Sequence, residues 1–170
     1  MICSLNLCML ESIYENLFRA KPREVKDVLP CSLPKCYTVR MQEPSIFTHI
    51  INGNIPSYRV YEDDLTYAFL DISPTVRGHV LVIPKQQVPY IWDLDDETYH
   101  ALMQTVKILG AHMREKLRVD YVGVKVVGEQ VPHAHVHLVP FNHIEEYKSS
   151  THLSYTPEEF TDIAQEIALE

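Results

Sequence analysis

Several features that define common protein classes are scarce in this chain, and each absence excludes a class. No apolar run reaches about 18 residues, so the sequence predicts no membrane-spanning helix. No internal repeat or low-complexity tract is visible. Lys and Arg number 15 against 23 Asp and Glu, and the net charge of −8 argues against a broad nucleic-acid or anionic-membrane surface. A phosphate group would therefore have to bind in a local pocket.

Cysteine is restricted to the first 40 residues, which contain Cys3, Cys8, Cys31 and Cys36 but neither histidine nor glycine. The four residues within each pair exceed the usual tight spacing of zinc ligands. Disulfides would require an oxidising compartment, and nothing in the sequence argues for export. We therefore expect a cytoplasmic protein whose cysteines form no metal site.

The charge of the chain changes after residue 40. Residues 1–40 contain six Lys or Arg and four Asp or Glu, a net charge of +2, so residues 41–170 must carry −10. We predict that residues 1–40 are a poorly ordered N-terminal extension, or that translation begins at Met41 and the extension is a start-site artefact. The intact mass of the native protein distinguishes the two.

Residues 44–170 are sufficient for one domain with its own core. Apolar spacing predicts helices at 45–51 and 95–117, and a capping box at Thr156 begins a third. Runs of β-formers bounded by turn residues predict strands at 58–62, 66–70, 79–83, 121–127 and 131–140. This order of elements predicts an α+β fold with a mostly antiparallel sheet, one long helix and a C-terminal helix.

The clearest chemistry lies in the last predicted strand, where His133, His135 and His137 alternate with apolar residues. Side chains of a strand alternate between its two faces, so the three imidazoles would share one face at intervals of about 6.5–7 Å. Buried polar groups need partners, so a row of histidines is a poor core and a candidate site. The alternative is a surface tract of histidines without a role.

Two kinds of chemistry suit clustered imidazoles. Neutral imidazole is a good nucleophile toward phosphorus, and close histidines disfavour one another's protonation, which keeps the attacking ring neutral. Neighbouring histidines can then hold the phosphate oxygens. The competing role is metal binding, for which neighbouring strands usually complete the ligand set. His79, at the start of another predicted strand, is the one other histidine with a suggestive position.

The run from His133 to Val139 matches the signature of the histidine triad superfamily, in which three histidines alternate with apolar residues. Upstream, the runs from Phe69 to Pro74 and from Gly78 to Lys85 resemble the nucleotide-binding segment of that family. The resemblance covers residues 44–170, and the three intact histidines place the chain nearer the Hint-like hydrolases than the galactose-1-phosphate uridylyltransferases. It implies a HIT-like fold and a homodimer, with the helix at 95–117 and a sheet edge as candidate interfaces.

The resemblance also implies a role for each site residue. His135 would be the nucleophile that becomes nucleotidylated, with its ring oriented by a main-chain carbonyl. His137 and His79 would contact the phosphate, and His133 would support the nucleophile. The other nucleotide contacts would be Asp71 to the ribose hydroxyls, Phe69 and Ile72 to the base, and Gly128 and Gln130 in the loop before the triad. From the sequence alone, the two apolar residues are equally well explained as core.

The implied activity is hydrolysis or transfer at the α-phosphate of purine nucleoside phosphoramidates or AMP conjugates, without a cofactor and without a nucleic-acid or membrane partner. The alternatives are a dinucleoside polyphosphate hydrolase and a non-catalytic nucleotide-binding regulatory protein. Many bacterial relatives use Cys-x-x-Cys to bind a structural zinc ion. Because Ser45 and Thr48 occupy those positions here, we expect no metal.

Overall fold

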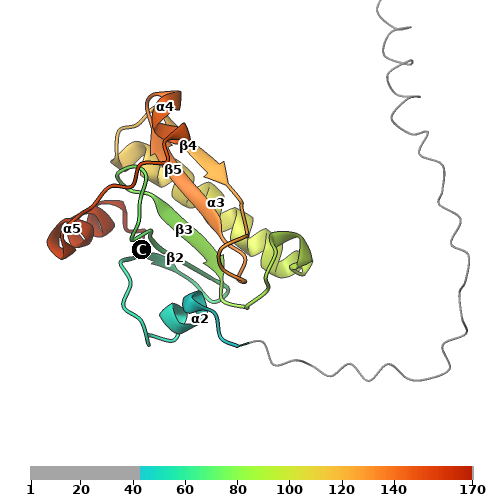
Figure 1. Ribbon diagram of the computed structural model, residues 1–170. Coiled ribbons are helices and arrows are strands. Elements are labelled where there is room, and N and C mark those ends of the chain that lie inside the picture. Colours follow the sequence, from blue (N-terminus) through green and yellow to red (C-terminus); the bar gives the residue numbers. More distant parts are fainter. Residues whose placement is uncertain (1–42, 170) are drawn as a thin grey trace, which may run out of the picture. The chain divides into compact units, whose positions relative to one another are not determined.

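The computed structural model describes residues 43–169, which are drawn in colour in Figure 1. The predicted N-terminal extension, residues 1–40, lies outside the described residues together with its four cysteines, and so does Met41. Between residues 43 and 169, no helix is both long and apolar enough to cross a membrane.

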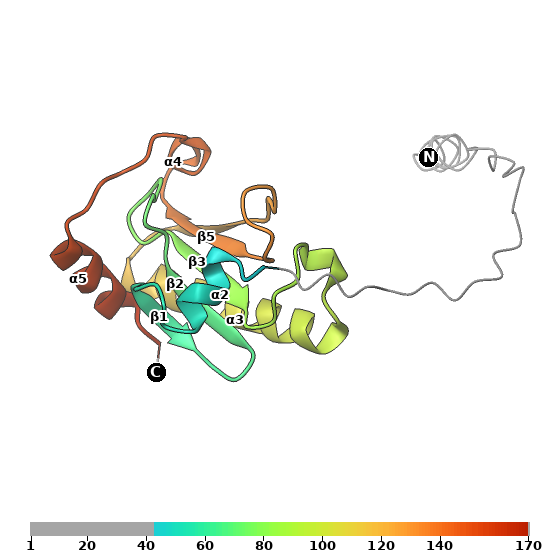
Figure 2. The ribbon, with the colours of Figure 1, turned by 60° about the horizontal axis from the view of Figure 1, so that its bottom comes forward.

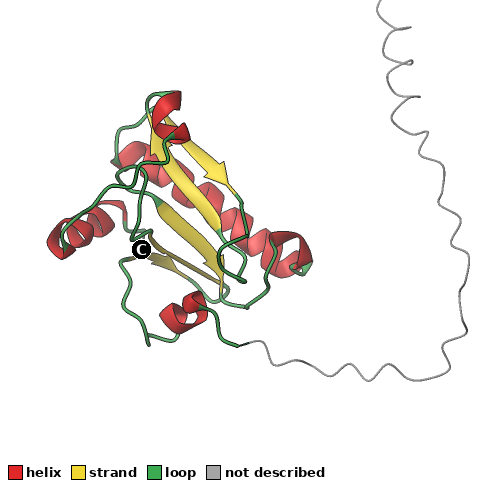
Figure 3. Cartoon of the chain, in the orientation of Figure 1, coloured by secondary structure: helices red, strands yellow, loops and turns green. Residues whose placement is uncertain are grey.

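The fold is α+β, as the sequence predicts, and is built on one antiparallel sheet (Figure 3). The strands are β1 (Arg59–Glu62), β2 (Thr66–Leu70), β3 (Val80–Pro84), β4 (Tyr121–Lys125) and β5 (Val136–Phe141). Their order in space is β1-β2-β3-β5-β4, and every pairing is antiparallel. Strand β5, which carries the end of the histidine run, therefore lies between β3 and the edge strand β4.

The helices begin where local sequence provides a cap. They are α2 (Ile46–Ile51), α3 (Asp96–Lys116), α4 (Ile144–Lys148) and α5 (Pro157–Ile167), with a 3₁₀ turn, η1 (Ile91–Asp93). Ser45 and Asp95 cap α2 and α3 by accepting hydrogen bonds from the amides of Thr48 and Thr98. Thr156 forms the predicted capping box of α5. The sequence patterns do not predict α4 or η1, because α4 buries no side chain and η1 has only three residues.

Alternation along the central strands sends side chains into two cores, one on each face of the sheet. The larger core, covered by α3 and α5, takes Ala68, Leu70, Val80, Val82, Val136 and Leu138 from the strands. The smaller core, which includes Phe47 of α2, takes Tyr67, Phe69, Leu81 and Ile83. Figure 2 shows α2 and α3 on opposite sides of the sheet, and the side toward α2 is named the α2 face below.

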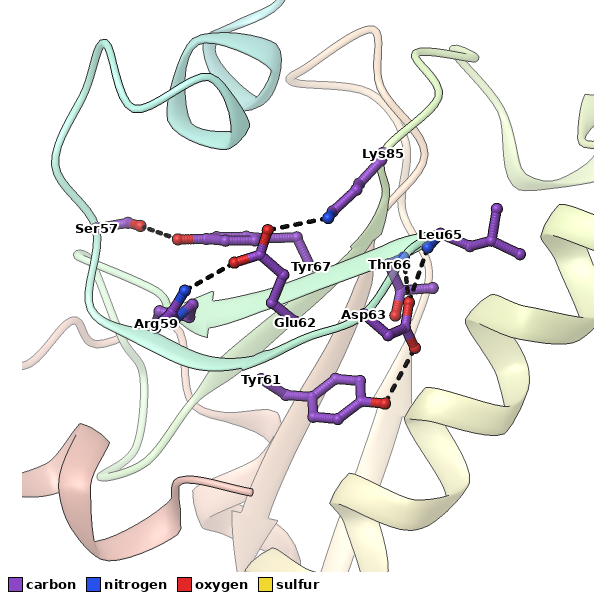
Figure 4. A network of polar contacts seen from close by, with 9 residues as sticks. All are labelled: Ser57, Arg59, Tyr61, Glu62, Asp63, Leu65, Thr66, Tyr67 and Lys85. Carbon is purple, nitrogen blue, oxygen red and sulfur yellow. Dashed lines mark hydrogen bonds and ion pairs between the residues drawn. The ribbon is translucent and has the colours of Figure 1, made fainter. Parts of the chain in front are cut away.

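The β1–β2 hairpin is closed by one carboxylate (Figure 4). Asp63 accepts hydrogen bonds from the amides of Leu65 and Thr66, at 2.9 and 2.7 Å, and from the hydroxyl of Tyr61 at 3.1 Å. Burial raises the pKa of the Asp63 carboxyl, but these donors outweigh burial and hold it below its usual value. The hydrogen bonds to Asp63 therefore stabilise the turn between β1 and β2 at the edge of the sheet.

The prediction that residues 131–140 form one strand is wrong in its first half. Strand β5 begins only at Val136, so His133 and His135 precede it. The amide of Ala134 donates to the carbonyl of Val88 and not to β3, and Pro84 at the end of β3 has no N–H for a further ladder bond. Strand β4 likewise ends at Lys125 and not at residue 127. Only His137 of the three histidines therefore lies within a regular strand.

Candidate active site

His135 lies at the entrance to β5 with its ring on the α2 face. The residue is 5 % exposed, and its ring packs edge-on against Phe47, with ring centroids 5.4 Å apart. Its Nδ1 lies 2.7 Å from the carbonyl oxygen of His133. A carbonyl can only accept, so Nδ1 donates and carries the ring proton. The Nε2 atom of a neutral ring then keeps a free lone pair, as a nucleophile requires.

His133 lies beneath the site and is fully buried. Its Nε2 donates to the carbonyl of Pro84, and its Nδ1 accepts from the hydroxyl of Ser45, each at 2.8 Å. Burial lowers the pKa of His133, although the bond to Pro84 raises it, so the ring is neutral in this environment. Both nitrogens are occupied, which leaves none for a substrate. Its main-chain carbonyl orients His135, so the contacts of His133 are those of a supporting residue.

His137 and His79 form a second, adjacent pair. The Nε2 of His79 and the Nδ1 of His137 are 3.0 Å apart, and the rings of His135 and His137 have centroids 5.1 Å apart. The Nδ1 of His79 accepts a long hydrogen bond of 3.4 Å from the amide of Thr75, so Nε2 is the nitrogen that donates to His137. These contacts bring His79, His135 and His137 together at one point of the sheet.

Burial keeps this pair neutral. Burial, together with smaller contributions from His79 and His135, lowers the pKa of His137 to about 4. It also lowers the pKa of His79, which the nearby Asp71 carboxylate only partly offsets. A bound phosphate would act in the opposite direction and favour protonation of both rings. The site can therefore gain positive charge when an anion enters it.

Two of the predicted nucleoside contacts, Asp71 and Phe69, lie near these residues. Asp71 has its Oδ2 3.7 Å from the Nδ1 of His79, while its Oδ1 accepts from the amide of Ser73. Phe69 is buried against Phe47, with ring centroids 5.6 Å apart, whereas Ile72 is 73 % exposed. The side chains of Phe69 and Ile72 are thus in different surroundings, one in the core and one open to a ligand.

The loop before the triad holds Gly128 and Gln130. Gly128 has a φ of +75°, and the ring of Tyr90 lies 3.6 Å from the place where a Cβ would be. Gln130 is exposed, and none of the hydrogen bonds within residues 43–169 joins its side chain to a triad histidine. The structure thus brings His79, His135 and His137 together but does not bring Gln130 to them.

Asp71, His79 and His137 also have the composition of a metal site. One ligand atom from each lies within 4.8 Å of the others, so the three groups could hold a divalent ion. At the positions of the zinc-binding cysteines, Ser45 donates to His133 and Thr48 donates to the side chain of Gln87 at 2.6 Å. These two hydroxyls are thus engaged in hydrogen bonds within the protein.

Sequence patterns miss two residues that shape this site. Phe47 packs against His133 and His135, and Lys125 pairs with His137 across β4 and β5. An aromatic residue in a short amphipathic helix gives no sign of its partner. Lys125 fits a strand pattern, but the sequence does not show which residue it pairs with. That pairing with His137 depends on the register between β4 and β5, which only the structure gives.

Known proteins are similar to this chain in sequence and in fold. The family model for the HIT domain matches residues 52–144. The adenosine 5′-monophosphoramidase HNT1 of Saccharomyces cerevisiae is 36% identical over 116 residues, which cover 64% of this chain and 73% of the yeast protein. The purine nucleoside phosphoramidase of Escherichia coli K12 is 36% identical over 106 residues, 58% of this chain and 88% of that protein. The crystal structure of a Hit-like protein involved in cell-cycle regulation from Bartonella henselae matches with a TM-score of 0.63 and 31% identity, covering 72% of this chain and 93% of that one.

Proposed function

The chain belongs to the HIT domain family, and on that premise we propose that it hydrolyses purine nucleoside phosphoramidates or related AMP conjugates at the α-phosphate. The observation that carries the proposal is the bond from Nδ1 of His135 to the carbonyl of His133, because it leaves the Nε2 lone pair free for attack. The yeast and Escherichia coli relatives are named as phosphoramidases, which supports the same substrate class here.

The proposed reaction has two steps at phosphorus. The Nε2 of His135 bonds to the α-phosphorus, the P–N bond to the amine breaks, and its electron pair stays on the amine nitrogen, which takes up a proton. Water then attacks the nucleotidyl-histidine, and the P–N bond to His135 breaks. Its electron pair returns to Nε2, a proton passes to solvent, and the nucleoside monophosphate is released. His79 and His137 hold the phosphate oxygens, and Asp71 binds the ribose hydroxyls.

The test of this proposal is His135→Ala, compared with His143→Ala at the exposed N-cap of α4. We expect the first variant to lose turnover of adenosine 5′-phosphoramidate by at least about 10³-fold, because the nucleophile is gone. Binding of AMP, measured by calorimetry, should remain within a few fold, and His143→Ala should retain activity. Unchanged turnover in His135→Ala would disprove the assigned nucleophile.

Two other functions use the same pocket. A dinucleoside polyphosphate hydrolase would be revealed by assaying diadenosine polyphosphate beside the phosphoramidate. A nucleotide-binding regulatory protein would bind AMP without turning over either substrate. The Asp71–His79–His137 cluster favours a metal site as a further alternative, for which one equivalent of metal retained after chelation would be the supporting result.

We also propose a homodimer. Strand β4 lies at the edge of the sheet, and edge strands expose unpaired main-chain groups. A groove between α3 and β4 continues this edge and is lined by apolar groups including Val106, Ala111, Tyr121, Val124 and Phe141. Tyr121 and Val124 are exposed in the single chain. A second copy that pairs at β4 would cover both the edge and the groove.

A cytoplasmic location is the remaining part of the proposal. An enzyme with the substrates proposed above must lie in a compartment that contains nucleotides. Fractionation of cells that express the full chain tests this expectation, and recovery in the extracellular medium would contradict it.

A further inference from the structure

Lys125 lies on the α2 face beside the histidines. It is the last residue of β4 and pairs with His137 of β5. Paired side chains point to the same face, with Cβ atoms about 4.5–5.5 Å apart. The register continues across the sheet, because His137 also pairs with Leu81, and Leu81 pairs with Phe69. One row of side chains therefore crosses four strands, from Phe69 on β2 to Lys125 on β4.

The ammonium group of Lys125 is held by Tyr147. Its Nζ donates a hydrogen bond of 2.8 Å to the carbonyl of Tyr147 and lies 4.4 Å from the centroid of that ring. Among the ion pairs of residues 43–169, none includes Lys125. An ammonium group has three donors, so two remain for a ligand. Tyr147 thus holds the ammonium group of Lys125 in place without supplying a negative charge that would neutralise it.

This lysine provides a permanent positive charge where the histidines provide none before substrate binds. Burial lowers the pKa values of His137 and His79, so both rings are neutral near pH 7 in the free protein. The charge of Lys125 lowers both values further, so its electric field reaches both rings.

The row of side chains from Phe69 to Lys125 also indicates how a bound substrate would lie across the sheet. In the proposed function the base lies near Phe69 on β2, and the α-phosphate lies at His137 of β5 and at His135, which directly precedes β5. The part of the substrate beyond the α-phosphate then extends over β4, where Lys125 lies. We propose that Lys125 binds the leaving group and selects substrates whose leaving group is anionic, such as a further phosphate or a carboxylate-bearing amine. This inference rests on the proposed function, because it takes His135 as the nucleophile.

The chemistry at phosphorus explains the preference. When the Nε2 of His135 attacks a polyphosphate substrate, the bond from the α-phosphorus to the bridging oxygen breaks and its electron pair stays on that oxygen. The departing phosphate therefore gains negative charge close to the ammonium group, which stabilises it. An unsubstituted amine leaves without negative charge and gains nothing from Lys125.

The test compares Lys125→Met and Lys125→Arg with Lys116→Met, which removes the same charge from the exposed end of α3. Each is assayed with diadenosine tetraphosphate, an aspartate phosphoramidate of AMP and adenosine 5′-phosphoramidate. We expect Lys125→Met to lower kcat/KM by about tenfold or more for substrates with an anionic leaving group and by less than about threefold for the unsubstituted phosphoramidate. Lys125→Arg should restore most of the loss, and Lys116→Met should show none.

The pattern of losses identifies the anion. A selective loss with diadenosine tetraphosphate alone supports a phosphate leaving group, and a selective loss with both charged substrates supports any anion. Equal losses for all three substrates, or no loss at all, would overturn the inference. His135→Ala assayed in parallel keeps the two proposals separate, because full activity in that variant would reject the nucleophile whatever Lys125→Met does.

Discussion

Burial holds three imidazoles of this site below the ordinary histidine pKa of 6.5, with that of His137 at about 4. Neutral rings suit a site in which one imidazole must attack phosphorus and its neighbours must accept protons only after an anion arrives. The same burial links the chemistry of the site to the stability of the fold, because an unfolded chain would protonate these rings at higher pH.

We expect stability to decrease as the pH falls from about 6.5 toward 4. In this range the unfolded chain binds protons at His79, His133 and His137 while the folded protein does not, so unfolding is favoured by acid. The contribution of His137 is on the order of 2–3 kcal/mol of unfolding free energy at the acid end. Urea unfolding at pH 7.0 and pH 4.5 measures this decrease in the free energy of unfolding.

The matched comparison is His137→Asn, which removes the titrating group. Its unfolding free energy should depend less steeply on pH than that of the wild-type protein over the same range. Equal slopes for the two proteins would show that His137 is not buried as a neutral ring.

At the residue scale, the sequence indicates which side chains could react, but it does not indicate which residues contact one another in the fold. The alternation of His133, His135 and His137 is enough to predict a candidate site. The bond from Ser45 to His133 is not predictable in this way, because the two residues are 88 positions apart. Only the tertiary structure brings the N-terminal cap of α2 under the histidine run.

Elements with a strong period are the ones that the sequence predicts well. The predicted helix at 95–117 corresponds to α3, and the predicted strands at 58–62 and 66–70 correspond to β1 and β2. The boundaries of β4 and β5 differ from prediction, because a strand ends where its partner stops offering main-chain groups. For β5 that partner is β3, which ends at Pro84, far from β5 in sequence, whereas β4 pairs only with β5 and ends opposite His137.

At the element scale, Gly123 of β4 is expected to be required for the packing of α4. A Cβ at this position would overlap the ring of Tyr147, which also holds Lys125. Gly123→Ala should therefore destabilise the fold by about 1–3 kcal/mol, as overpacking does, and displace the tyrosine. Urea unfolding gives the stability change, and tyrosine fluorescence or NMR reports the ring.

A double-mutant cycle isolates this contact. In a Tyr147→Ala background the ring is absent, so adding Gly123→Ala should cost much less than it does in the wild-type protein. The same cost in both backgrounds would mean that the backbone of β4, and not the ring, limits the position.

At the scale of the whole molecule, the exposed β4 edge and the adjoining groove predict that two copies associate. Val124 lies in this groove and is exposed in the single chain. Val124→Asp should convert a dimer into a monomer, because a carboxylate would be buried without a partner in the interface. Light scattering coupled to size-exclusion chromatography measures the mass.

Ile144→Asp is the control for this experiment, because Ile144 is exposed on α4 and lies outside the groove. It should leave the mass of the assembly unchanged. A wild-type protein that is monomeric at micromolar concentration, or a Val124→Asp variant that stays dimeric, would contradict the proposed interface.

The start of β5 at Val136, later than predicted, leaves a main-chain carbonyl free to orient the ring of His135. Because the strand begins at Val136, the carbonyl of His133 takes no part in a ladder and remains available to the ring of His135. A strand extended back to His133 would commit that oxygen to sheet bonding, and the ring could then rotate or exchange its two tautomers. The main chain is irregular from Val131 to His135, and that irregularity favours the tautomer in which the attacking nitrogen is unprotonated.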